Sequence, residues 1–518
     1  MSFVRYKRTK SGTYAYRVTS YWDKKMKRTR QKTEYLGKVT EDGIKKVRLS
    51  PVPPRAALNY GDVSVLYEII TQQSLPEILR ASHGVDTANV LIGLAIYRLL
   101  SNTSISAFKT WLESSYLSEI TPLKNPSSQN LSRILEHVGR DEHALQRFFY
   151  EWCMSQGIEN TLMYDITSLS SSSKLIELLE YGYNRDNDGL PQVNMGLIAG
   201  VESHLPLFYK LFPGSITDVS TLSNLISEVK SLGITETLFV LDRGFYSKTN
   251  IHRLLETGFD FVMPMPFSVK DAQRIISETN PIITSPEHAV SYGDKIIYTM
   301  SGWVAVGEHR VRYHIYFDEE RQAREVNSFY QRLIAVEEKL NGRTIQKWEN
   351  PDAIVADTAK NLRNCLTWEV KSNKIQLKRK KKAITRLLNR MGKTIILCSR
   401  NMSWEDTLSF NRGREVVERM FRTVKNDLSG LPLRVHKEHT LKGYLLVVFI
   451  SLIIYFELTK RMKKTGLQKN YSMETLLMEL GKLRMVQLID GNQMLTEPTR
   501  KQKNILTKLN MKNLMPKT

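Results

Sequence analysis

Two strand-like stretches decide the fold: TLMYDITSL, residues 161–169, and TETLFVLDRGF, residues 235–245. Each opens on an apolar, β-forming run, and the run meets an aspartate: Asp165 follows LMY and Asp242 follows LFVL. We expect both aspartates to end their strands. A carboxylate at the mouth of a rigid strand is exposed at the sheet edge, where it can bind a hard cation. For Asp165 alone, a helix N-cap or an Asx turn is an equally good interpretation.

The segments around these stretches predict the rest of an α/β core. PQVNMGLIAGV and LPLFYKLF are two strands joined by a short turn, which indicates a hairpin. STLSNLISEVKSLG and SKTNIHRLLETG have helical patterns, and FDFVMPMP is another strand. The order of strand, hairpin, helix, strand, helix and strand predicts a mixed α/β sheet with its functional edge at the strand ends.

The whole chain divides by texture into six parts. The sequence predicts a basic β-rich DNA-binding module, a helical domain, the first part of the α/β core, a β-rich insertion, the second part of the core, and a basic C-terminal segment for dimerisation or DNA contact. Their bounds are 1–55, 56–158, 159–266, 267–393, 394–460 and 461–518.

Composition excludes several classes of protein. The 518 residues are 41% hydrophobic, enough for a sizeable core. The three cysteines are far apart in the sequence and indicate neither a disulfide framework nor a zinc site. The N-terminus has no apolar signal region. The most apolar run, residues 444–456, is shorter than the roughly 20 residues of a membrane span, so we expect a buried core helix and no membrane association. We expect a cytoplasmic location.

Charge is segregated along the chain. The formal net charge is +22, yet residues 1–50, 371–400 and 460–518 carry +11, +11 and +9, which leaves about −9 for the rest. One basic run is more often a solvated tail. Three such segments around a mildly acidic body favour a polyanionic partner, because each neutralised phosphate releases counterions. Nucleic acid is the expected partner.

A third acid lies in REVVERMFRTVK, residues 414–425. At about 100° per residue, Arg414, Glu418 and Lys425 fall on one helix face. Val417, Met420, Val424 and Leu428 form an apolar arc beside that face. Glu418 alone is most simply an ion-pair partner. Together with the two strand aspartates it makes a plausible three-carboxylate site for Mg²⁺, the type that holds paired ions about 3.5–4 Å apart in phosphodiester chemistry.

YDITS (164–168), LDRGFYS (241–247) and the RxxxExxxxxxK helix (414–425) resemble the DDE transposases of bacterial insertion sequences. The resemblance is to the cut-and-paste group with a Tyr-Arg-Glu-Lys signature and an insertion before the glutamate. GYNRDNDGLPQVNMGL and LPLFYKLFPGSITDVSTL extend the likeness.

This resemblance implies a ribonuclease H-like catalytic domain whose metal-binding residues are Asp165, Asp242 and Glu418. It implies two Mg²⁺ ions, with Mn²⁺ as a substitute, and a homodimer or higher oligomer on double-stranded DNA, both element ends and target. The location implied is the bacterial cytoplasm, at the nucleoid. In this mechanism, metal-activated water cuts the element ends and the freed 3′-OH attacks the target.

The resemblance also places residues against DNA. It implies that Arg414 and Lys425 contact the terminal DNA, and we add Arg422 to this set. We also expect Asn411 to contact DNA; it stands where the signature has tyrosine, so the contact of that ring is missing. Arg243 fits a phosphate contact or a local ion pair equally well.

Other interpretations remain open. One is a ribonuclease H-like nuclease without strand transfer, and another is a non-catalytic DNA-binding protein derived from a transposase. No phosphate-cradling Gly-Lys-Ser/Thr loop is present, so we expect no use of ATP. NRDNDG (184–189) lacks the ligand pattern of a calcium loop. His436 and His439 fit helix-end or phosphate-facing positions better than zinc ligands. Three tryptophans of the insertion fit core packing better than base stacking: Trp303, Trp348 and Trp368.

Overall fold

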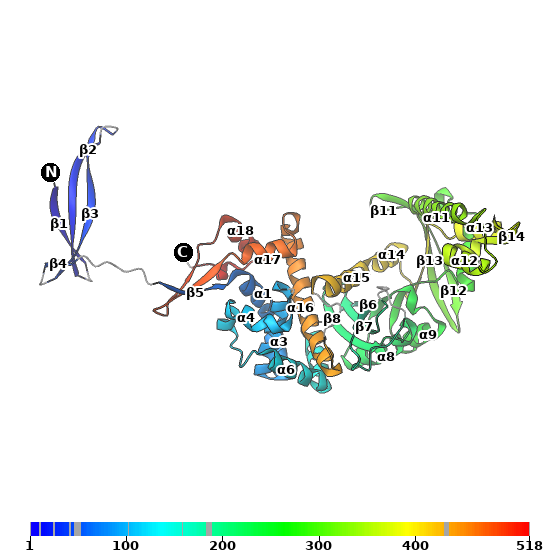
Figure 1. Cartoon of the computed structure of the whole chain (residues 1–518), viewed down its shortest axis with the longest axis horizontal. Helices are drawn as coiled ribbons and strands as arrows, with labels where there is room; N and C mark the ends of the chain where they lie inside the picture. The colour runs from blue at the N-terminus through cyan, green and yellow to red at the C-terminus, as the bar shows by residue number, and fades with distance from the viewer. Residues whose placement is uncertain are drawn as a thin grey trace. The chain divides into compact units, whose positions relative to one another are not determined.

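The computed structural model divides the chain into two compact units (Figure 1). One unit holds Met1–Leu58 with Met485–Thr496, and the other holds Asn59–Arg484 with Glu497–Thr518. The residues described are 2–9, 12–23, 26–40, 43–45, 53–101, 103–157, 159–182, 189–428 and 435–516. The NRDNDG segment lies outside them, apart from its final glycine.

The first unit is built from antiparallel strands. β1 (Ser2–Thr9), β2 (Gly12–Asp23), β3 (Arg28–Thr40) and β4 (Gly43–Lys45) form a sheet in chain order. Every residue of β1 is exposed, whereas Ala15 and Val18 on β2 are fully buried. A second, three-stranded sheet has the order β18 (Gln493–Leu495), β17 (Arg484–Leu488) and β5 (Pro54–Asn59).

The second unit opens with helices that pack on one long apolar helix, α16 (Glu438–Lys464). The opening helices are α1 (Gly61–Gln72), α2 (Leu75–His83), α3 (Val85–Leu100), α4 (Phe108–Glu113), α5 (Leu117–Ile120), α6 (Ser128–Arg140) and α7 (Glu142–Gln156). α16 is long and apolar enough to cross a membrane, but 89% of its most apolar window is buried inside the protein. It is therefore the core helix predicted from residues 444–456.

α16 joins the helical region to the sheet. The ring of Phe449 lies 6.4 and 5.4 Å from those of Phe148 and Phe149 on α7, and 5.3 Å from that of Tyr209 on β8 (Pro206–Pro213). Such offset or edge-on aromatic contacts stabilise a packed interface. α16 thus holds the α/β core and the helical region together.

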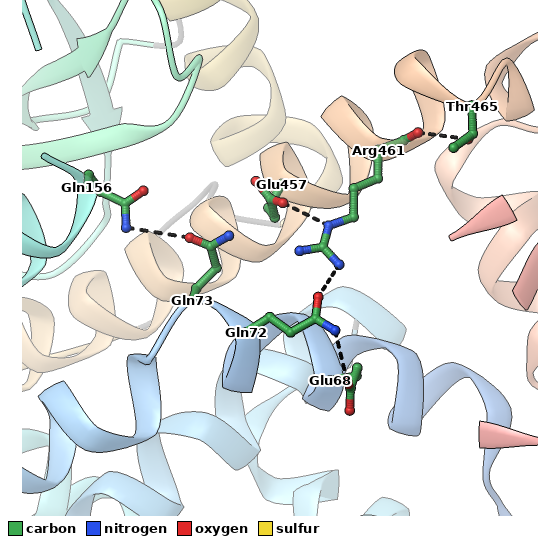
Figure 2. Close-up of polar contacts among 7 residues, drawn as sticks. All are labelled: Glu68, Gln72, Gln73, Gln156, Glu457, Arg461 and Thr465. Atoms are coloured by element: carbon green, nitrogen blue, oxygen red, sulfur yellow. Dashed lines mark hydrogen bonds and ion pairs between the residues drawn. The ribbon is translucent and has the colours of Figure 1, made fainter. Parts of the chain in front are cut away.

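Polar side chains tie the far end of α16 to α1 (Figure 2). Arg461 Nε donates to Glu457 Oε1 at 2.8 Å on the same helix, and its Nη1 donates to Gln72 Oε1. Gln72 Nε2 in turn donates to Glu68 Oε1 at 2.8 Å. Glu457 is largely buried, so this hydrogen-bonded arginine balances a carboxylate that would otherwise be costly to bury.

Nine strands form one large sheet, which confirms the predicted mixed α/β fold. Asp165 lies on it and Asp242 directly follows one of its strands. The order is β11 (Ala289–Tyr292), β12 (Lys295–Val306), β13 (His309–Phe317), β16 (Lys393–Cys398), β10 (Asp260–Pro264), β9 (Leu238–Leu241), β6 (Thr161–Ser170), β7 (Gln192–Gly200) and β8. β6, β9 and β10 are parallel neighbours, and β7 and β8 form the expected hairpin. α8 (Asp218–Ser231) and α9 (Lys248–Glu256) connect these strands.

Residues 267–393 contribute to two structures. β11, β12 and β13 extend the main sheet, since β13 pairs with β16. The part from residue 319 to 391 packs around a separate apolar core that includes Phe329, Leu333 and Ile375. Its elements are α11 (Glu319–Leu340), α12 (Pro351–Ala359), β14 (Leu366–Lys371), β15 (Lys374–Arg379) and α13 (Lys381–Leu388).

The three tryptophans of this region differ from one another. Trp368 packs against the separate core, and its indole N–H donates to Asp352 Oδ1 at 3.0 Å. Trp303 and Trp348 are 43% and 83% exposed. The prediction of core packing is therefore wrong for these two; the ring of Trp303 instead faces the guanidinium groups of Arg310 and Arg312.

Candidate functional site

Asp165 and Asp242 lie on neighbouring parallel strands. The ladder between β6 and β9 ends with Tyr164 opposite Leu241, so the two aspartates are the next residues on both strands. Adjacent strands are about 4.8 Å apart, which brings the two residues side by side. Asp242 begins a short 3₁₀ turn, Arg243–Phe245, and its side chain caps no helix.

Asp165 departs from the prediction that it ends a strand. It lies in the middle of β6, which continues to Ser170 because β7 pairs with it along its whole length. Its side chain is partly exposed because β9, on the other side, stops at Leu241. Asp165 Oδ1 accepts a hydrogen bond from the backbone N–H of Ile166 at 2.8 Å.

Glu418 reaches the site from α15 (Glu415–Arg422). The predicted apolar arc of this helix is confirmed, since all four members are at most 1% exposed: Val417, Met420, Val424 and Leu428. α15 packs on β6 and β7. The opposite face leaves the Glu418 side chain 54% exposed. The helix therefore presents Glu418 away from the core, as its pattern predicts.

Arg414 connects Glu418 to Asp242. Its Nη2 lies 2.9 Å from Asp242 Oδ1 and 3.9 Å from Glu418 Oε1, and its side chain is only 15% exposed. Arg414 Nε is buried and has no hydrogen-bond partner among the residues described. The arginine predicted to contact DNA thus lies between two of the candidate metal ligands.

Carboxylate oxygens are the ligands that Mg²⁺ prefers, so the donor types of Asp165, Asp242 and Glu418 fit this ion. Within the described ranges, no three His, Cys, Asp or Glu side chains lie close enough together to hold a metal ion. The cation between Asp242 and Glu418 is the guanidinium of Arg414.

Lys425 lies in a different type of helix from the one its spacing assumed. After Arg422 the α-helix gives way to a π-helical turn, Thr423–Asp427. A π turn holds more residues than an α turn, so the 100° spacing that aligned Lys425 with Glu418 no longer applies. Lys425 is half-buried, whereas Arg422 is exposed.

Two other predicted DNA contacts differ in environment. Asn411 lies near the end of α14 (Trp404–Gly413), and its Oδ1 is buried with no hydrogen-bond partner in the part of the chain that the structure describes. Arg243 is exposed and makes no ion pair with any described residue. The local ion pair that the sequence allowed for Arg243 is therefore absent from these ranges.

The sequence interpretation missed Asp218. This residue begins α8, and a Cβ atom on Gly244 would lie 2.9 Å from Asp218 Oδ2. A fourth carboxylate therefore packs against the turn after Asp242, and a side chain at position 244 would have to push it aside. An aspartate in the first turn of a helix is common, so the sequence carried no specific signal for this contact.

The family model of the transposase DDE domain matches residues 165–454, more than half of the chain. The search of curated protein sequences found no match to this chain. Among solved structures, the cryo-EM structure of a piggyBac transposase synaptic complex with hairpin DNA is similar, with a TM-score of 0.41 and 11% identity over 88% of this chain and 86% of that one. The family match begins at Asp165 and includes Asp242, Arg414 and Glu418. The chain therefore belongs to the DDE-domain transposase family.

Proposed function

We propose that the protein is an insertion-sequence transposase. It binds the terminal inverted repeats of its element, hydrolyses DNA at the element ends and joins the 3′-OH ends to target DNA, as a homodimer or higher oligomer. One observation supports the proposal in a chain of the DDE family. Asp165 and Asp242 occupy neighbouring positions on two adjacent parallel strands, and Arg414 links Asp242 to Glu418.

Asp165, Asp242 and Glu418 would hold two Mg²⁺ ions, for which Mn²⁺ substitutes. When bound, such a pair activates the attacking oxygen and stabilises the leaving one. Arg414 holds Asp242 in place through a charge-assisted hydrogen bond. Arg243 and Arg422 have exposed side chains near these carboxylates in sequence, and they contact DNA phosphates.

The experiment compares Glu418→Gln with the wild-type protein on a supercoiled plasmid carrying the element's own ends. The amide keeps the shape of the side chain but removes the anionic ligand, so cleavage is lost while binding of terminal DNA remains. Glu415→Gln is the matched control, since Glu415 is an exposed acid on the same helix.

Cleavage by Glu418→Gln at the wild-type rate would remove Glu418 from the site. Cleavage by the wild-type protein with no joined product would instead identify a nuclease without strand transfer. Sequencing the DNA that flanks the gene gives an independent check, because an insertion sequence carries short inverted repeats there.

A further inference from the structure

A groove on the second unit lies outside the three carboxylates. It encloses about 730 Å³ between the turn after α3, the N-terminal half of α6 and the start of α16. We propose that this groove binds backbone phosphates of the DNA strand that the transposase cleaves. The inference rests on the proposed function, because it assigns part of the DNA substrate to a defined surface.

The walls of the groove suit phosphate oxygens. Arg133 and Lys437 are exposed cations, and Lys437 is shared with Glu136. Arg98 is a buried cation whose guanidinium donates to protein oxygens, so it adds positive charge behind the wall rather than a direct contact. Six hydroxyl side chains line the groove: Thr103, Ser104, Ser106, Ser128, Ser132 and Thr440. Ser104 and Ser106 hydrogen-bond to one another and Thr103 to Tyr97, whereas Ser128, Ser132 and Thr440 can donate to a ligand. Phosphate oxygens accept hydrogen bonds and carry negative charge, so they need this combination of donors and cations.

The one acid of the walls, Glu136, is already neutralised. Lys437 Nζ lies 2.9 Å from its Oε2, and Arg140 Nη2 lies 2.5 Å from its Oε1. The hydrogen bond from Lys437 is the main reason that the pKa of Glu136 is below its usual value. α6 also starts at the groove, with Ser128 in its first turn, and a helix N-terminus favours an anion.

The groove is attached to two of the three elements that carry candidate carboxylates. Arg98 Nη2 donates to the backbone oxygen of Leu428 at 3.0 Å, and Leu428 closes the turn that follows the Glu418 helix. Ser173 Oγ, just after β6, donates to the backbone oxygen of His436 at 3.2 Å. Contacts at the groove can therefore position the strand whose scissile phosphate lies at the carboxylates.

The walls favour a DNA backbone over a free nucleotide. The ring of Tyr444 is 8% exposed and has the guanidinium of Arg98 over it, 5.4 Å from its centroid. A base therefore finds little aromatic surface on Tyr444 for stacking, which usually supplies much of the affinity for a base. The available contacts are to phosphate and sugar, and such contacts position DNA without reading its sequence.

The test uses the full chain and a fluorescent 30-bp duplex that contains one element end. Arg133→Ala and Ser132→Glu change exposed side chains of the groove, and Arg147→Ala on α7 is the matched control for loss of one exposed arginine. Affinity is measured by anisotropy at several salt concentrations. Loss of one phosphate contact reduces the slope of log affinity against log salt by about 1.

We expect that reduced slope for Arg133→Ala, about tenfold weaker binding for Ser132→Glu, and wild-type behaviour for Arg147→Ala. Wild-type slope and affinity in both groove variants, with unchanged thermal unfolding, would overturn the inference. Saturable binding of free deoxyadenosine monophosphate that Arg133→Ala abolishes, with an unchanged DNA slope, would also overturn it in favour of a nucleotide site. These outcomes leave wild-type plasmid cleavage untouched, so they are distinct from failure of the proposed function.

Discussion

Arg414 sets the charge balance of the candidate metal site. Its guanidinium lies 2.9 Å from Asp242 and 3.9 Å from Glu418, so it occupies the space between two carboxylates that would ligate an ion. A fixed cation and a metal ion compete for the same oxygens, because each neutralises their charge. Binding of DNA phosphate to Arg414 would free the carboxylates for the metal.

Replacing Arg414 with glutamine should therefore strengthen metal binding in the absence of DNA. We expect Mn²⁺ to bind several-fold more tightly to Arg414→Gln than to the wild-type protein, as measured by the electron paramagnetic resonance signal of free Mn²⁺. The same variant should bind terminal DNA more weakly if Arg414 contacts a phosphate, as the family resemblance implies. Arg414→Lys, which keeps the charge, is the control, and Mn²⁺ affinity equal in all three proteins would exclude the competition.

At the scale of single residues, the sequence predicted which acids come together. It did not predict where each side chain lies within its strand or helix. The pairing of Asp165 with Asp242 followed from two apolar runs, each ending in an acid. The position of Asp165 within β6 depends on β7, and a hairpin partner is a tertiary feature. The π turn that moves Lys425 leaves no mark in the apolar periodicity, because Val424 and Leu428 are buried all the same.

Two glycines fix how α6 and α16 pack. A Cβ atom on Gly139 would lie 1.8 Å from the backbone oxygen of His439, and one on Gly443 would lie 2.0 Å from that of Leu135. Real side chains do not approach backbone this closely, so the two helices touch where both residues lack a side chain. This crossing holds α16 in the helical region and also borders the groove at Leu135.

Gly443→Ala should force the two helices apart. We expect it to lower the free energy of unfolding by at least about 2 kcal/mol, because backbone on the facing helix cannot yield as a flexible side chain can. Urea denaturation followed by circular dichroism measures the loss. Gly413→Ala is the control: its Cβ would meet no atom within 4 Å, so helix propensity predicts no loss or a gain of up to about 1 kcal/mol. A neutral Gly443→Ala would contradict the close packing.

Strand order was the least predictable feature at the scale of elements. Local patterns predicted most strands and helices of the core, including the β7–β8 hairpin and the helices α8 and α9. They could not reveal that β11, β12 and β13 extend the same sheet as β6 and β9, because sheet neighbours are set by long-range pairing. The segment that looked like one insertion is therefore part sheet and part separate core.

Across the whole molecule, a buried and a half-buried histidine, His314 and His83, link stability to pH. His314 is fully buried on β13, and its Nδ1 lies 2.6 Å from Ser301 Oγ. His83 packs edge-on against Phe148 at a ring distance of 6.5 Å. Burial, which disfavours the charged imidazolium, lowers the pKa of each to about 4.

Acidification should therefore destabilise the fold. The unfolded chain protonates these histidines near pH 6.5 and the folded chain only near pH 4, so their contribution is intact above pH 6.5 and is lost as the pH falls from 6.5 towards 4. The loss is at most about 3 kcal/mol for each histidine. Urea denaturation between pH 7.5 and 4.5 measures it.

His314→Gln should flatten this pH dependence even if it lowers stability throughout, whereas the exposed His143→Gln should not. If the free energy of unfolding had the same slope against pH in wild type and His314→Gln, His314 would not be neutral in the folded protein. A histidine that stays neutral when folded destabilises the protein wherever the unfolded chain gains a proton at that residue.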